Sequence, residues 1–458
     1  PAAVMSCPTA RLLAAGLVDG SVVETVDLDP DQPFAPGDED GEGRRERVVP
    51  ASPTQEAAVR LAPTSADRGI LSWVYQLNGT LHVDALAEAF DEVVARHEVL
   101  RTRVEWRGHD LVQVVTPFRP GVLEIASVLP GPEGHPLDVA LARTRALHRD
   151  LPIVGLQGLR AILHHVGHRR HVLSVFFSEA LVDGASTVRV AAEIERSYAA
   201  RTGHPAPDPG WARSTASYVD HVRDHPVPTA VRWRAECHWR SLGRPGPMLG
   251  SWPTTTDEKP SYWSGRMTAD EWAVVGGTAR LLRSTPYVVV LAALEVALAR
   301  VAGACDYLVT GTVHHRHLAG TASMIGCFDS MVWIEAGVEP ATPLSVAVES
   351  VGRAVRDATA ASAIPAVVAT SDEGEPGGAG IVFSMFEARP GLALPGVRQR
   401  RFRLSEARDA LRLTCTSLPG GERALFLSSA TAPPDLLAVL ADEVRAALTA
   451  PDAEAVTA

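Results

Sequence analysis

Strand-like and helical patterns of apolar residues alternate through both halves of this 458-residue chain. Residues 160–177 contain two apolar runs of β-type composition joined by the basic turn Gly167–Arg170. Apolar residues at helical spacing flank them, at Val139–Asp150 and Thr187–Ala200. Because strands and helices are mixed in each half, and because the chain is too long for one ordinary core, we expect an α/β fold of two layered sandwich domains.

The same two periodicities predict the remaining elements. Helical spacing occurs in three more segments, Leu81–Val94, Thr285–Val301 and Pro434–Leu448. β-Type patterns occur in three others: 99–115, 307–313 and 414–429. The last of these is typical of a hairpin, with Pro419-Gly420-Gly421 as its turn. Residues 371–380 are polar and glycine-rich, which predicts an exposed loop.

The beginning of the chain differs from the rest in composition. Residues 27–48 are acidic, rich in Pro and Gly, and poor in apolar side chains. We therefore expect a flexible acidic lead-in over residues 1–47. Pattern breaks near 203–210 and 224–229 favour an N-terminal domain at 48–222 and a C-terminal domain at 223–458.

Charge and cysteine content exclude several classes of protein. The formal net charge is −11 without any purely basic segment, so a nucleic-acid partner is not expected. No apolar run approaches the roughly 20 residues of a membrane span, and no secretory signal opens the chain, so we expect a cytoplasmic protein without a membrane partner. Neither a metal constellation nor a nucleotide-binding glycine motif occurs, which predicts no directly bound cofactor. Five scattered cysteines predict buried, reduced thiols: Cys7, Cys237, Cys305, Cys327 and Cys415.

A series of short motifs, in order along the chain, resembles the condensation-domain family of nonribosomal peptide synthetases, which belongs to the chloramphenicol-acetyltransferase-like superfamily. The motifs are Pro50–Gln55, Arg96–Thr102, a segment with tryptophans at 215–240, Thr310–Arg316, Ile325–Phe328 and Ile381–Ser384. The similarity extends from about residue 48 to about residue 448. It implies a V-shaped pseudo-dimer of two acetyltransferase-like lobes with a central tunnel.

The family's defining motif, His-His-x-x-x-Asp-Gly, is rewritten in this chain. The matching heptad is Ser178-Glu179-Ala180-Leu181-Val182-Asp183-Gly184, so both histidines are absent. In the family the second histidine orients or deprotonates the acceptor, a role suited to an imidazole. Asp183 and Gly184 remain, and the resemblance implies a structural ion pair between Asp183 and Arg316. The pair His164-His165 lacks the spacing to Asp-Gly, and we expect its members to point to opposite faces of a strand.

Two interpretations of Glu179 stay open. As a functional group, its carboxylate is a base or hydrogen-bond acceptor at the position of the lost imidazole. As a relic, it faces water or pairs with an arginine. Ser178 is a second catalytic candidate, although no His-Asp pair is placed by the sequence to activate it.

Four further residues are candidates for the tunnel lining: Ser186, His315, Ser330 and Ser384. Ser330 and Ser384 stand where the family has asparagines. Ser186 fits part of the heterocyclisation variant of the motif. His315 belongs to a group with His314 and His317 around Arg316, one of which could replace the missing base.

The resemblance therefore predicts an acyltransferase-type enzyme that acts on acyl or peptidyl thioesters, with an amine or another small-molecule acceptor. The phosphopantetheine arm would arrive on a partner carrier protein, and the chain itself is expected to be a monomer. The bond formed (amide, ester, ring or hydrolysed thioester) stays open. The alternative is a catalytically inactive platform that recruits or gates carrier proteins or tailoring enzymes.

Overall fold

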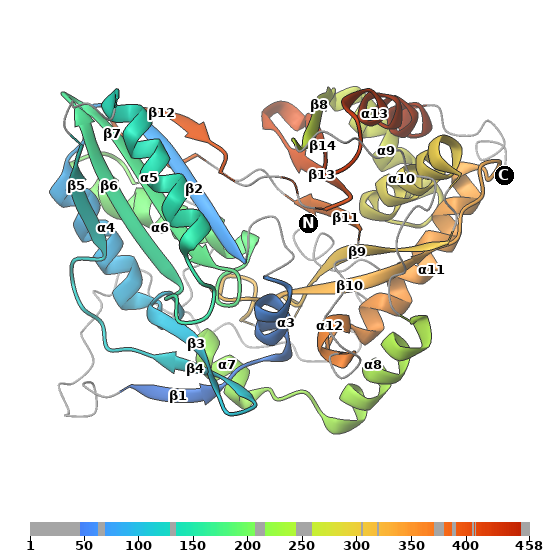
Figure 1. The fold of residues 1–458 in the computed structure, drawn as a ribbon, viewed down its shortest axis with the longest axis horizontal. Helices are drawn as coiled ribbons and strands as arrows, with labels where there is room; N and C mark the ends of the chain where they lie inside the picture. Colours follow the sequence, from blue (N-terminus) through green and yellow to red (C-terminus); the bar gives the residue numbers. More distant parts are fainter. Residues whose placement is uncertain are drawn as a thin grey trace.

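In the computed structural model, the described residues are 46–62, 69–128, 134–206, 216–243, 259–303, 306–317, 320–370, 380–386, 391–404, 407 and 409–449. They form two α/β halves that lie side by side and meet near the middle of the molecule (Figure 1). The predicted fold class, two sandwiches of helices and sheets, is confirmed. The central tunnel stays a prediction.

The N-terminal half is built on a five-stranded sheet with the order β12-β2-β7-β6-β5. Its strands are β2 (Ile70–Gly79), β5 (Leu123–Ser127), β6 (Leu159–Gly167), β7 (Arg170–Ser178) and β12 (Val397–Phe402). Helices α4 (Val83–Arg96) and α6 (Gly184–Arg201) pack with one face of the sheet, and α5 (Pro136–Asp150) packs on the other. Because helices cover both faces, β7 is buried from His171 to Ser178.

A smaller three-stranded sheet lies beside it, with the order β1-β4-β3. Its strands are β1 (Arg47–Pro50), β3 (Thr102–Arg107) and β4 (Asp110–Val115). The short helix η1 (Glu98–Arg101) directly precedes β3. After β1 the chain enters α3 (Pro53–Leu61), which begins with a capping box between Ser52 and Gln55.

The C-terminal half contains a six-stranded sheet with the order β10-β9-β11-β13-β14-β8. Its strands are β8 (Ser261–Met267), β9 (Tyr307–His314), β10 (Asp329–Ala336), β11 (Ile381–Phe386), β13 (Leu411–Ser417) and β14 (Arg423–Ser429). The short turn η3 (Pro419–Gly421) joins β13 to β14. The helices of this half are α8 (Thr229–Leu242), α9 (Ala269–Leu281), α10 (Pro286–Ala302), α11 (Leu344–Ala361), α12 (Ala366–Ala369) and α13 (Pro434–Thr449). Helix α10 forms the centre of this half, and its residues are buried without interruption from Val288 to Ala299. Helix α7 (Tyr218–Asp224) packs on the N-terminal half instead, with Val219 against Val49 of β1 and Val115 of β4.

Segments of the second half of the sequence complete the N-terminal half. Strand β12 pairs antiparallel with β2, from Val397 opposite Gly79 to Phe402 opposite Val74. Four side chains of the 324–328 segment and that of Leu392 belong to the hydrophobic core around β2 and β7: Met324, Ile325, Cys327, Phe328 and Leu392. Figure 1 shows the orange β12 at the edge of the blue-green sheet. A division of the chain into two sequence ranges therefore does not coincide with the two packed cores.

The predicted elements correspond closely to the observed ones. The hairpin at 160–177 is β6 and β7, and the hairpin at 414–429 is β13 and β14. His164 is buried on β6 while His165 is partly exposed, as expected for adjacent residues of a strand. Cys327 and Cys415 are buried thiols, but the prediction for Cys237 is wrong, because this side chain lies on the exposed side of α8. The lead-in up to residue 45 and most of the loop at 371–380 lie outside the described residues.

In the part of the chain that is described, no single helix combines the length and the apolar composition needed to cross a membrane. Helices α9 and α10 pass that test only when taken together, and they meet at an angle of 101°.

Candidate functional site

The rewritten heptad forms the turn from β7 into α6. The carbonyl oxygen of Ser178 accepts hydrogen bonds from the amides of Leu181 and Val182, both at 2.9 Å. The amide of Glu179 donates to the carbonyl of Gly69 at 2.8 Å. Asp183 is the N-cap of α6, and its Oδ1 accepts from the amide of Ser186 at 2.6 Å. The turn is therefore fixed at both ends, by the sheet and by the helix cap.

Asp183 also forms the ion pair that the resemblance implies. The Nη2 of Arg316 lies 2.8 Å from Oδ1 and 2.7 Å from Oδ2 of Asp183. Both side chains are almost completely buried. Burial alone would raise the pKa of Asp183, but Arg316 and the amides of Ser186 and Phe328 act against it, and the pKa lies below its ordinary value. The carboxylate is held ionised at the junction of the two halves.

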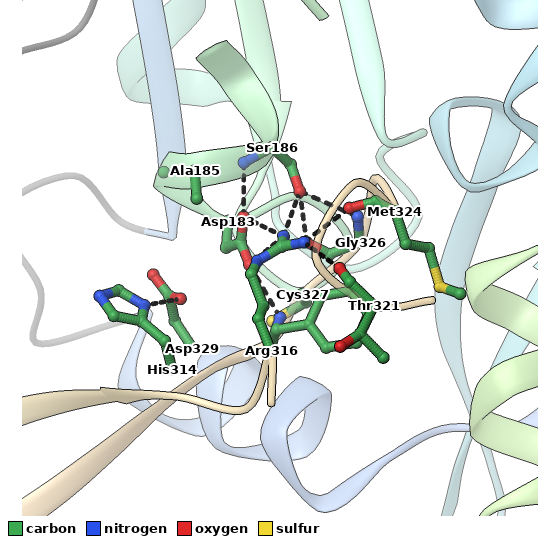
Figure 2. Close-up of polar contacts among 12 residues, drawn as sticks. Asp183, Ala185, Ser186, His314, Arg316, Thr321, Met324, Gly326, Cys327 and Asp329 are labelled. Carbon is green, nitrogen blue, oxygen red and sulfur yellow. Dashed lines mark hydrogen bonds and ion pairs between the residues drawn. The ribbon is translucent and has the colours of Figure 1, made fainter. Parts of the chain in front are cut away.

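Arg316 anchors the loop between β9 and β10 to this carboxylate. Its Nη1 donates to the carbonyls of Thr321 at 2.9 Å and Met324 at 2.7 Å. Figure 2 shows the guanidinium enclosed between Asp183 on one side and these carbonyls on the other. A buried charge with so many partners is a structural group rather than a reactive one.

Ser186 is part of the same network. Its Oγ accepts from Arg316 at 2.7 Å and from the amide of Gly326 at 2.9 Å, and it lies 2.9 Å from the carbonyl of Gly326. The side chain is fully buried. Its hydroxyl therefore joins α6 to the 324–328 segment, whereas the sequence predicted a tunnel-lining position.

Ser178 ends β7 in a fully buried position. Its Oγ has no hydrogen-bond partner among the described residues. A serine nucleophile needs a neighbouring base and access for the substrate. This geometry provides neither for Ser178, and the predicted catalytic role gains no support from it.

Glu179 is partly buried at the start of the turn. Its charge acts on the thiol of Cys327, which is fully enclosed. Burial is the main cause that raises the pKa of Cys327 far above its usual value, and Asp183, Asp329 and Glu179 add to the effect. Three carboxylates, two from the heptad turn and one from β10, thus act on one buried thiol.

His314 and Asp329 form a second charged pair beside the network, which the sequence only half predicted. They stand directly opposite each other on β9 and β10, and Nδ1 of His314 is 2.5 Å from Oδ1 of Asp329. Asp329 is the main cause that raises the pKa of His314 to about 9. The histidine was a candidate from its place near Arg316, but the aspartate was missed, because only the register of the two strands brings them together.

The remaining candidates occupy different surroundings. Burial lowers the pKa of His315 to about 4, so this imidazole is neutral, and its Nε2 is enclosed without a partner among described side chains and backbone. Ser330 is fully buried, and its hydroxyl donates to the carbonyl of Ser362 at 2.8 Å, which makes it a packing residue of β10 and not the predicted lining residue. Ser384 is partly buried on β11, paired with Thr414 of β13.

A model of the condensation-domain family matches residues 46–375, which is more than half of the chain. The chain belongs to the condensation-domain family. The nonribosomal peptide synthetase asqK of Emericella nidulans is 29% identical over 278 residues, which cover 58% of this chain and 10% of that protein. The curated relatives are thus far longer, and this domain corresponds to a small part of each.

Solved structures share the fold at lower identity. The condensation domain of the monacolin K polyketide synthase MokA has a TM-score of 0.67 at 17% identity, and the alignment covers 88% of this chain and 97% of that one. The X-domain of teicoplanin biosynthesis, solved in complex with OxyB, has a TM-score of 0.67 at 22% identity, with 88% and 93% covered. This condensation domain therefore has the fold of both types of relative.

Proposed function

We propose that this condensation domain is an acyltransferase-type enzyme that acts on acyl or peptidyl thioesters delivered by a carrier protein, with Glu179 in place of the missing imidazole. The observation that carries the proposal is the position of Glu179. It is partly buried at the end of β7, next to an intact Asp183–Arg316 pair. The framework of the site is kept while its reactive position holds an ionisable group.

The proposed reaction does not need Glu179 to be a strong base. A thioester is already activated, so acyl transfer depends mainly on holding the acceptor close to the carbonyl carbon. A carboxylate accepts a hydrogen bond from an amine and takes up the proton that the amine loses. We therefore favour an amine acceptor over a hydroxyl, which needs a stronger base.

Mass spectrometry of a loaded carrier protein tests this proposal. Candidate acyl carriers are incubated with amine acceptors, with and without the domain, and the mass of the tethered chain is followed. Glu179→Gln is expected to reduce the transfer rate about 100-fold, the lower range for loss of a general base. Glu349→Gln on α11 is the matched control, since Glu349 is exposed and far along the chain from the heptad. Equal rates for Glu179→Gln and wild type would contradict a catalytic role.

A non-catalytic platform is the second candidate. Two observations favour it: the absence of both motif histidines, and the fold similarity to an X-domain that was solved together with OxyB. A platform predicts that Glu179→Gln leaves the pathway product unchanged, whereas deletion of the whole domain abolishes it. Free acid released from a loaded carrier would indicate hydrolysis instead.

A further inference from the structure

His314 is held in one orientation by its neighbour across the sheet. It ends β9, directly opposite Asp329 at the start of β10, and the Nδ1–Oδ1 distance is 2.5 Å. A hydrogen bond to Nδ1 fixes which nitrogen faces the carboxylate, and so directs Nε2 away from it. The side chain is 34% exposed, so the ring is not sealed inside the protein. In the described part of the chain, this contact is the ring's one hydrogen bond.

The groups around His314 keep it positively charged. Asp329 raises its pKa to about 9, burial acts in the opposite direction, Asp183 at the start of α6 adds to the rise, and Arg316 reduces it. Below that pH the ring is an imidazolium, and both of its nitrogens donate hydrogen bonds. At neutral pH His314 is therefore an acid or a hydrogen-bond donor, and not a base.

This charged pair lies next to the turn that contains Glu179. The amide of Phe328, the residue before Asp329, donates to Oδ2 of Asp183 in that turn at 3.0 Å. In Figure 2 the His314–Asp329 pair lies to one side of the Asp183–Arg316 network, with the imidazole on the outer side of the pair. A site with one carboxylate acceptor and one cationic donor has the two complementary groups that acyl transfer requires.

We infer, on the basis of the function proposed above, that Nε2 of His314 donates a hydrogen bond to the carbonyl oxygen of the tethered acyl thioester, and that Asp329 is the positioning residue for this donor. Neither residue belongs to the rewritten heptad. The substrate group recognised is the thioester carbonyl, together with the negative charge that it develops when the acceptor attacks.

In the transfer step the amine nitrogen forms a bond to the carbonyl carbon, and the C=O π pair moves to the oxygen, which His314 stabilises. Glu179 takes up one proton of the amine. When the C=O bond re-forms, the C–S bond breaks, and the pantetheine sulfur leaves with its electron pair and receives the proton from Glu179. The products are an amide and the free thiol of the carrier.

A binding experiment tests the contact without turnover. The probe is S-hexanoyl-pantetheine labelled with ¹³C at the carbonyl, followed by NMR in the absence of any acceptor. With wild-type protein we expect a saturable downfield shift of the carbonyl signal, because a cationic donor polarises the C=O bond. His314→Gln should lose the shift. Glu179→Gln should keep it, and so should His317→Gln, a matched control at an exposed histidine.

Two outcomes of the binding experiment overturn the inference. One is a carbonyl signal that does not shift when wild-type protein is mixed with millimolar probe, and the other is a shift that persists in His314→Gln. A shift that depends on His314 in a protein without transferase activity refutes the catalytic function and leaves the contact standing. Transfer that depends on Glu179 but not on His314 supports the catalytic function and refutes the role of His314.

Where turnover is measurable, the pH profile separates positioning from mere structure. His314→Gln is expected to lower kcat about 100-fold, as for the loss of one oxyanion donor. Asp329→Asn removes the main cause of the raised pKa of His314, so its activity should fall as pH rises through the ordinary value of 6.5, whereas wild-type activity should persist to about pH 9. An unchanged profile in Asp329→Asn contradicts the positioning role.

Discussion

Two buried carboxylates, one at the junction of the halves and one in the core of the C-terminal half, have opposite surroundings. Asp183 receives a guanidinium and two backbone amides, and its pKa is lowered. Glu295 lies in the middle of α10 among apolar residues, and neither of its side-chain oxygens has a well-formed hydrogen bond to a described residue. Burial raises its pKa to about 8, against a smaller opposing effect from the backbone of Gly337. A buried carboxylate is thus kept charged where a cation and hydrogen-bond donors replace water. It is kept neutral where the surroundings are mainly apolar.

The largest expected effect comes from removing the partner of Asp183. Arg316→Met leaves a buried carboxylate without its cation, and we expect the free energy of unfolding to fall by about 3–5 kcal/mol at pH 7. Chemical denaturation followed by circular dichroism measures this. Adding Asp183→Asn to the same variant should recover part of the loss, because no stranded charge remains. A loss below about 1 kcal/mol in the single variant would mean that water reaches Asp183.

Glu295 should behave in the opposite way. Its pKa is raised from 4.5 in the unfolded chain to about 8 in the folded protein. Its contribution to stability is therefore complete below pH 4.5 and is lost as pH rises toward 8. Glu295→Gln should have the same stability as wild type near pH 4.5 and be about 3 kcal/mol more stable near pH 7. Denaturation curves across this pH range measure the difference, and a pH-independent difference would contradict the neutral state of Glu295.

The smallest effect is expected on the surface. Glu349 and Arg353 form an i,i+4 pair on α11 at 3.5 Å, with both side chains mostly exposed. Water and salt screen such a pair, so Glu349→Gln should change the free energy of unfolding by less than about 0.5 kcal/mol. The measurement is the same denaturation curve. A loss similar to that of Arg316→Met would mean that burial is not what separates the two ion pairs.

Local patterns were enough to predict most elements of the fold. The hairpin of β6 and β7 follows from two apolar runs around a basic turn, and α10 follows from a long and very apolar segment. The pairing of β12 with β2 could not be predicted, because 317 residues lie between Gly79 and Val397, its neighbour across the sheet, and nothing local specifies that contact.

The site was predictable only where the family motif survives. Asp183 and Arg316 were named from the resemblance, and their ion pair is present. Motif position could not show that Ser178 and Ser330 are fully buried, since burial depends on the helices packed around each strand. Asp329 was missed for a related reason: its significance arises from the register of β10 against β9, which the sequence does not state.

Strand β12 is synthesised long after β2, the strand with which it pairs. On the ribosome, β2 emerges more than 300 residues before the segment that covers its outer edge. Until then the nascent sheet has an open edge of unsatisfied backbone groups, to which other nascent chains could add. A fragment that ends near residue 222 should have the same open edge on β2. An experiment on the isolated N-terminal half should therefore include the Leu392–Phe402 segment.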